Sequence, residues 1–217
     1  MKRNYGRNGF TLVEMLVVIG IIAVLVGASV GGYSFAIKKA EATRGRELVS
    51  NVATALNVLF QRQNRWPPSL IEESQGEGRL TAKAAACLAV NGLMSLSYVT
   101  QEVDGETVYT LSGLDRCGIV TPWATAAIKR LSPSDSAMNA KVPGGGTVQD
   151  HQLRFAIDDD GDGIVEARLG SRTVRVRSNA VVWCWGQNGK EDDYAASMSG
   201  RGKADDIYSW TRAQEEK

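Results

Sequence analysis

Histidine, cysteine and an excess of charge of either sign are all scarce in this chain of 217 residues. With a single histidine, His151, a histidine-rich metal site or a Ser/His/Asp triad has only one residue to build on. Three cysteines without a Cys-x-x-Cys pair are too few for a disulfide scaffold and do not suggest a zinc ribbon. Lys plus Arg number 25 against 24 for Asp plus Glu, so the chain lacks the basic excess of a nucleic-acid-binding protein, and no nucleic acid partner is expected.

A long hydrophobic run is present near the N-terminus. Residues 1–9 carry three basic side chains and no acid, and residues 10–37 contain one charged side chain, Glu14. About 20 apolar residues in a helix span the hydrocarbon core of a membrane, so this run is long enough. The basic flank predicts that residues 1–9 face the cytoplasm and that the chain from residue 38 onward lies outside it.

Two ordinary interpretations fit this run poorly. A cleaved secretory signal peptide has an apolar run about half as long, with a small-x-small site soon after it. A plain signal anchor leaves Glu14 unexplained, because a carboxylate near the bilayer centre costs about 2.5 kcal/mol or more.

The run from Gly9 to Met15, GFTLVEM, follows a short basic leader and resembles the prepilin signature of the type IV pilin and pseudopilin family. The resemblance implies that a prepilin peptidase cuts after Gly9 and N-methylates Phe10. The apolar helix would then anchor the subunit in the inner membrane and later form the core of a filament. Glu14 would pair with the free ammonium of Phe10, within one chain or between neighbouring subunits.

The rest of the chain predicts an α+β fold. Apolar residues at three- and four-residue spacing extend the first helix to about Gln63, and Pro67-Pro68 follows its end. The mixed segment that follows predicts a helix over 81–96. Strands are predicted over 98–103, 106–111, 153–157, 165–169, 173–176 and 180–185. We therefore expect a long N-terminal helix packed on a C-terminal antiparallel sheet, which is the pilin fold.

This pattern divides the chain into three predicted segments: a leader over 1–9, a transmembrane and filament-core helix over 10–37, and a globular domain over 38–217. The domain would lie in the periplasm, or outside the cell once assembled. Within it, Cys87 and Cys117 either form a disulfide in an oxidising compartment or stay two buried thiols.

One acidic segment resembles a calcium loop by its spacing. Asp158, Asp160, Asp162 and Gly163 stand where such a loop has positions 1, 3, 5 and 6. Alternate side chains of a tight turn converge on one hard cation, which is why the spacing matters. The twelfth position is Leu169 instead of Glu, so the alternative is a turn whose acids are only solvated.

A looser resemblance links the C-terminal part to the major pseudopilin of type II secretion. It rests on Arg65-Trp66-Pro67-Pro68, on Thr121-Pro122-Trp123, where that family has Asp-Pro-Trp, and on the C-terminal loop. The resemblance implies that this loop binds one structural Ca²⁺. Its candidate ligands are Asp205 and Asp206, followed by Asn188, Asp192 and Asp193.

Together these features predict a structural subunit of a type IV pilin-like filament, with a type II secretion pseudopilin as the first choice and a type IV pilus subunit as the alternative. The implied partners are further copies of the chain, related pilins, the prepilin peptidase/methyltransferase and an inner-membrane assembly platform. A membrane-tethered enzyme or binding domain is the rival from another class. The sequence offers no nucleophile and base pair for it.

Overall fold

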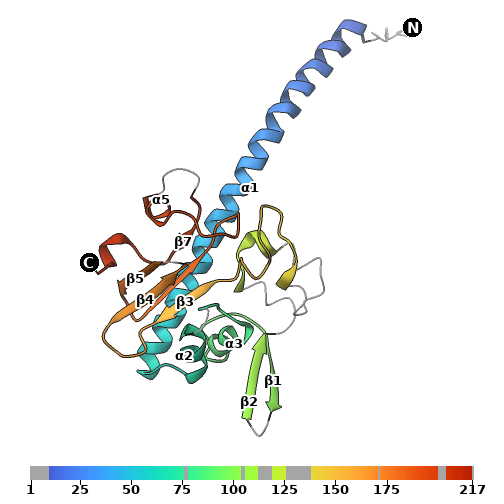
Figure 1. The fold of residues 1–217 in the computed structure, drawn as a ribbon. Helices are drawn as coiled ribbons and strands as arrows, with labels where there is room; N and C mark the ends of the chain where they lie inside the picture. Colours follow the sequence, from blue (N-terminus) through green and yellow to red (C-terminus); the bar gives the residue numbers. More distant parts are fainter. Residues whose placement is uncertain are drawn as a thin grey trace, which may run out of the picture. The chain divides into compact units, whose positions relative to one another are not determined.

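The computed structural model describes residues 10–75, 78–103, 106–111, 119–125, 138–170, 172–199 and 204–216. The helices are α1 (Leu12–Gln63), α2 (Pro68–Gln75), α3 (Ala82–Val90), α5 (Tyr194–Ser199) and the 3-10 helix η3 (Arg212–Gln214) (Figure 1). The strands are β1 (Tyr98–Val103), β2 (Glu106–Leu111), β3 (Arg154–Ile157), β4 (Ile164–Leu169), β5 (Arg172–Arg177), β6 (Ala180–Cys184) and β7 (Ile207–Tyr208). The predicted α+β class, a long helix followed by antiparallel strands, is confirmed.

The chain divides into two compact units, Met1–Ala40 and Glu41–Lys217. Helix α1 contributes to both and ends where the sequence predicts. Asn64 takes a left-handed conformation, with φ of 51°, and its N–H donates to the carbonyl of Phe60 at 2.7 Å. A left-handed residue in this position closes the last turn of a helix, and the prolines that follow cannot continue the helical bonding.

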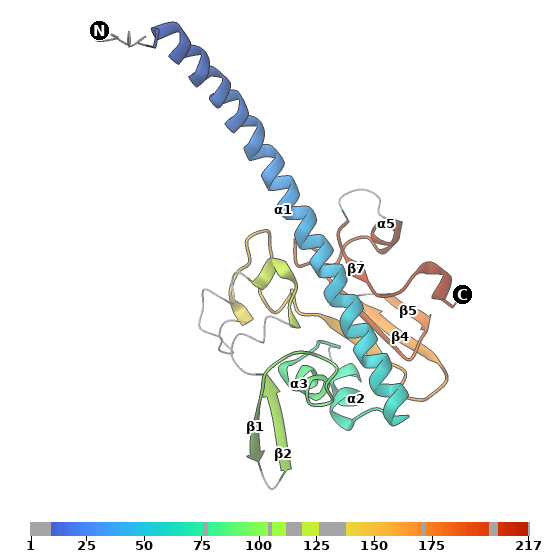
Figure 2. The same cartoon turned by 180° about the vertical axis from the view of Figure 1, so that it is seen from behind.

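The second half of α1 supplies one wall of the main hydrophobic core. Its buried side chains recur at three- and four-residue spacing: Val49, Val52, Ala53, Ala55, Leu56 and Leu59. This face packs on the three-stranded sheet, and the Asn57 side chain donates to the carbonyl of Ala180 on β6 at 3.4 Å. Figures 1 and 2, which look from opposite sides, both show this half of α1 lying along the sheet.

The strands form three separate antiparallel sheets, ordered β1-β2, β3-β6-β7 and β4-β5. In the middle sheet Phe155 of β3 stands opposite Val182 of β6. Strand β4 alternates buried and exposed residues, so Val165, Ala167 and Leu169 face a second core. Trp183, Trp185 and Trp210 complete that core, so the two tryptophans of the 180–185 segment serve sheet packing.

The helix predicted over residues 81–96 is shorter than expected. Thr81 caps α3 by accepting the N–H groups of Lys83 and Ala84, and α3 ends at Val90. Asn91 is its C-cap, and Gly92 follows with φ of +68°. An L-amino acid side chain disfavours that conformation, so Asn91-Gly92 ends the helix before Leu93 can extend it.

Candidate functional site

The predicted cleavage residue Gly9 lies outside the described residues, so the part of the N-terminal site that the structure describes begins at Phe10. Phe10 is 72% exposed. Helix α1 opens with a capping box: Thr11 Oγ1 accepts the N–H of Glu14 at 3.3 Å, and Glu14 Oε2 accepts the N–H of Thr11 at 2.8 Å. The Thr11 hydroxyl also donates to Glu14 Oε2 at 2.8 Å. Glu14 therefore stabilises the first turn of its own helix.

This contact differs from the expected pairing of Glu14 with the Phe10 ammonium. In the uncleaved chain the Phe10 nitrogen is a peptide group and carries no charge, so the pair can form only after the leader is removed. The Thr-x-x-Glu spacing that signals a capping box is visible in the sequence, and it is the signal by which the contact could have been found.

Large apolar side chains cover the surface of the first unit. Those more than half exposed include Leu12, Val13, Leu16, Ile19, Val24 and Leu25. Exposed apolar side chains in such number are typical of a surface that contacts a membrane or another protein.

None of the helices in the described ranges combines the length and the apolar character that crossing a membrane requires.

The C-terminal acidic loop, defined as residues 186–193 and 204–206, flanks α5. It brings Asp192, Asp205 and Asp206 together, with one carboxylate oxygen of each within 4.8 Å of the others. Backbone N–H groups hold these carboxylates in place. Asp206 accepts from Gly186 at 2.9 Å and from Asp192 at 2.8 Å, and Asp205 accepts from Gln187 at 2.7 Å. The N–H of Asp205 donates to Asp192 Oδ2 at 2.9 Å.

The negative charge of this loop is poorly compensated. Burial raises the pKa of Asp206 to about 6, and the nearby Asp192 and Asp205 carboxylates add to the rise. The pKa of Asp205 is also raised, first by burial and then by Asp192. Two carboxylates whose charged forms are disfavoured, with that of Asp192 beside them, form a site where a cation would relieve the repulsion.

The loop fits the structural calcium that the family resemblance implies. Asp205 Oδ1 is buried and has no hydrogen-bond partner among the described residues. Ca²⁺ takes six to eight oxygen ligands, chiefly carboxylates and carbonyls, and an unpartnered buried carboxylate oxygen is one such ligand. Asp192, Asp205 and Asp206 would hold the ion, which would neutralise their repulsion and join the two halves of the loop.

Two other predicted ligands take different positions. Asn188 contacts the cluster through its amide nitrogen, which donates to Asp192 Oδ1 at 3.0 Å. Its oxygen accepts the N–H of Lys190 at 2.7 Å. Asp193 is exposed, and its carboxylate accepts the N–H of Ala196 at 2.8 Å, so it caps α5 instead of joining the cluster.

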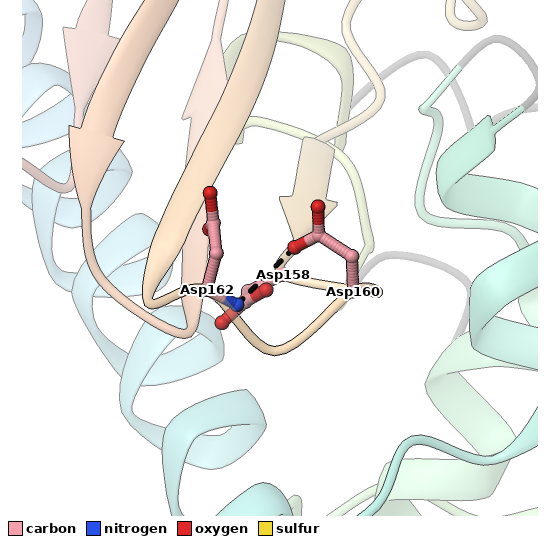
Figure 3. A group of neighbouring side chains, drawn as sticks. All are labelled: Asp158, Asp160 and Asp162. Atoms are coloured by element: carbon pink, nitrogen blue, oxygen red, sulfur yellow. Dashed lines mark hydrogen bonds between the residues drawn. The ribbon is translucent and has the colours of Figure 1, made fainter.

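The second acidic cluster is the turn between β3 and β4, and Figure 3 shows its three carboxylates. Asp158, Asp160 and Asp162 also bring one carboxylate oxygen each within 4.8 Å of the others. Asp158 is only 3% exposed, and its two oxygens accept the N–H groups of Gly161 and Gly163 at 2.7 and 2.8 Å. Asp160 accepts the N–H of Asp162 at 3.2 Å.

This turn lacks the ligand that closes a calcium loop. Leu169, which stands at the twelfth position, is fully buried in the second core. Glu166 lies on the exposed face of β4 and pairs with Arg175 at 3.7 Å. The turn therefore matches a calcium loop in its first half only. Backbone N–H groups occupy both oxygens of Asp158, as they do both oxygens of Asp206 in the C-terminal acidic loop.

His151 is a structural residue that sequence reasoning left without a role. It is fully buried, and its Nε2 lies 3.1 Å from the carbonyl of Gly145 while its Nδ1 lies 3.1 Å from Thr121 Oγ1. A carbonyl can only accept, so Nε2 carries the proton and the threonine hydroxyl donates to Nδ1. Burial lowers the pKa of His151, which keeps the ring neutral.

The cysteines give no test of the predicted disulfide. Cys87 lies half-buried on α3, and Cys117 falls outside the described residues. The pairing of Cys87 with Cys117 stays a prediction. Cys184 is buried in the main core on β6, where burial raises the pKa of its thiol well above the usual range.

Comparison with known protein families identifies the N-terminal segment. Residues 4–30 match the prokaryotic N-terminal methylation motif, which is the prepilin-type signal. Neither the curated proteins nor the solved structures contain a significant match to the chain. The motif covers Phe10, Thr11 and Glu14, and it supports a type IV pilin-like protein that is processed by a prepilin peptidase and assembled into filaments.

Proposed function

From the prepilin-type motif of residues 4–30, we propose that this chain is a structural subunit of a type II secretion pseudopilus. The motif carries the proposal, and the α+β fold with its long first helix agrees with it. The C-terminal acidic loop favours a pseudopilin, because the resemblance to that family implies a cation in this loop. A subunit of a type IV pilus is the second candidate, supported by the same motif.

In this proposal a prepilin peptidase removes residues 1–9 and methylates the new N-terminus at Phe10. Residues 10–37 anchor the mature subunit in the inner membrane, with the domain over 38–217 in the periplasm. The exposed apolar side chains of the first unit would contact lipid before assembly and other subunits afterwards. The partners would be the peptidase, an inner-membrane assembly platform, related pilins and further copies of this chain.

Glu14 would change its partner during this process. Before cleavage it caps α1 through Thr11. After cleavage the Phe10 nitrogen becomes an ammonium, and the carboxylate of a neighbouring subunit is a strong partner for it in an apolar setting. A buried ion pair of this kind fixes the register of one helix against the next, which is the role we assign to Glu14 in assembly.

We propose no catalytic role for the chain. A membrane-tethered hydrolase would need a base close to a nucleophile. His151, the single histidine, uses both ring nitrogens in contacts with Thr121 and Gly145, and it is fully buried. This geometry favours a structural part for the ring and supports a filament subunit over an enzyme.

Calcium in the C-terminal acidic loop is also part of the proposal. Asp192, Asp205 and Asp206 would hold it, and the Asp158–Asp162 turn is the weaker candidate because Leu169 supplies no carboxylate. The ion would act structurally by joining residues 186–193 to residues 204–206.

The experiment that tests the proposed function is N-terminal sequencing and intact-mass measurement of the protein purified from its native membrane. A chain that begins at Phe10 and carries one additional methyl group is expected. A chain that still begins at Met1 would contradict the pilin pathway and favour a plain signal anchor. A Gly9→Leu variant serves as the control, since a bulky residue there should block cleavage and leave the full-length mass.

A further inference from the structure

We propose that the glycine turn, defined as Gly144–Gly146, together with His151, positions the C-terminal acidic loop and sets its affinity for a cation. This inference rests on the calcium part of the proposed function. It assigns a role to a segment about 40 residues upstream of the loop that contributes none of the three carboxylates.

The glycine turn lies directly against the backbone of the loop. A Cβ at Gly144 would come 2.9 Å from the carbonyl oxygen of Gln187, and a Cβ at Gly145 would come 2.7 Å from that of Asn188. Real Cβ atoms essentially never approach backbone atoms closer than 3.0 Å. Both glycines also have φ values, +119° and +137°, that side chains disfavour. Contact between the two backbones therefore requires glycine at both positions.

His151 also holds the glycine turn. Its Nε2 donates to the carbonyl of Gly145 at 3.1 Å, and its backbone carbonyl accepts the N–H of Thr121 at 2.9 Å. A Cβ on Gly189 would come within 2.9 Å of the same Nε2. The His151 ring thus contacts the glycine turn at Gly145 and lies against Gly189, at the end of the 186–189 segment.

The supported segment is the part of the loop that orients the carboxylates. Gly186 and Gln187 donate their N–H groups to Asp206 and Asp205, and the Asn188 side chain donates to Asp192. A displacement of this segment would therefore move an anchor of every carboxylate in the cluster. Some residues hold metal-ligating side chains in place without touching the metal themselves. Mutating such a residue typically changes metal affinity about 10- to 100-fold.

The glycines offer a matched test. Gly146 and Gly92 share a φ of +68°, but a Cβ on Gly146 would lie 3.3 Å from Gly189 Cα, whereas one on Gly92 meets nothing within 4 Å. Alanine at either position meets the same unfavourable φ, and only Gly146→Ala also presses on its neighbours, which are Gly189 of the loop and Asp150. Gly145→Ala is the stronger variant, and Gly146→Ala keeps the test decisive if Gly145→Ala does not fold.

The experiment measures two quantities in the full chain in detergent. The first is the Kd for Ca²⁺ by calorimetric titration, and the second is the amide exchange rate of Gly186, Gln187 and Asp192 in calcium-free protein. We expect Gly145→Ala to raise Kd about 10-fold or more, with Gly146→Ala in the same direction and Gly92→Ala within about twofold of the wild type. Exchange at the three amides should accelerate in the first two variants alone.

Unchanged Kd and unchanged exchange in the glycine-turn variants would overturn the inference. A wild-type chain that binds no Ca²⁺ would refute the calcium part of the proposed function instead. In that case the exchange rates still decide whether the glycine turn positions the loop, since they are measured without the ion.

Discussion

The two acidic clusters each contain three aspartates with one carboxylate oxygen apiece within 4.8 Å of the others, yet they are built in different ways. In the Asp158–Asp162 turn the carboxylates are neighbours in sequence, and each accepts a backbone N–H within the turn. In the C-terminal acidic loop the fold brings Asp192 to Asp205 and Asp206 from the far side of α5. The first cluster is a turn motif, whereas the second is a tertiary contact.

This difference has an electrostatic consequence. In the turn, Asp160 and Asp162 are exposed, so water screens their charges. In the loop, Asp206 is buried with two carboxylates beside it, and its pKa rises to about 6. Carboxylates accept backbone N–H groups in both clusters, so the difference lies in burial: the loop crowds its charges away from water, and the turn leaves two of its three charges exposed. We therefore expect a cation to stabilise the loop more than the turn.

Calcium provides the largest expected contrast between the clusters. At a hundredfold excess over Kd, Ca²⁺ should raise the free energy of unfolding by about 2.7 kcal/mol. Asp206→Asn should remove most of this gain because it removes the most buried charge of the site. Asp160→Asn in the turn should keep it. Thermal unfolding of the full chain with Ca²⁺ and with a chelator measures the calcium-dependent gain in each variant. If Asp206→Asn and Asp160→Asn lose this gain equally, the expected difference between the clusters is contradicted.

Removing the central carboxylate of the turn should have the next largest effect. Asp158→Ala removes the buried carboxylate that accepts the N–H groups of Gly161 and Gly163, and the loss of these charge-assisted hydrogen bonds should cost about 2 kcal/mol. The loss should be equal with Ca²⁺ and with a chelator. Asp159→Ala is the matched control, because that side chain is exposed and accepts a hydrogen bond from the Gln75 side-chain amide. A loss that appears only in the presence of Ca²⁺ would show that the turn binds the ion.

The sequence predicted the features that depend on local patterns. The spacing of Val52, Leu56 and Leu59 predicted the buried face of α1, and alternation predicted the strand β4. The same reasoning extended α3 by six residues, because Leu93 and Leu96 continue an apolar pattern that the left-handed Gly92 interrupts. Propensity alone cannot detect a C-cap when apolar residues follow it.

The sequence predicted which acidic residues belong to each candidate site. It did not predict the residues elsewhere in the chain that contact these sites. The aspartates of the C-terminal acidic loop were named from the sequence, but Asp193 was named with them although it caps α5. His151 and the glycine turn lie far upstream, and no periodicity or spacing links them to the loop. Such contacts depend on tertiary packing, which a single sequence does not encode in any local pattern.

The buried His151 ring predicts that the stability of the folded chain depends on pH. Because burial lowers the pKa of His151, the unfolded chain takes up its proton near the usual value of about 6.5, before the folded chain does. The stability that this residue contributes is therefore present above that pH and is lost as the pH falls, by about 1.4 kcal/mol per unit of pKa difference. Chemical unfolding of the wild type and of His151→Gln between pH 8 and 5 measures this loss. The other titratable groups are the same in the two proteins. If the free energy of unfolding falls equally with pH in the wild type and in His151→Gln, the prediction is contradicted.

The smallest expected effect is a gain in stability when one aspartate of the C-terminal acidic loop is replaced by asparagine. The matching replacement in the Asp158–Asp162 turn should give no gain. Asp205→Asn keeps an acceptor for the Gln187 N–H and removes one of the three crowded charges, so the calcium-free protein should become more stable by about 0.5–1 kcal/mol. The same variant should bind Ca²⁺ more weakly. Asp162→Asn is the control in the turn, where an exposed carboxylate accepts the Ile164 N–H and the amide should change neither quantity. A destabilised Asp205→Asn chain in chelator would mean that the loop charges are already compensated.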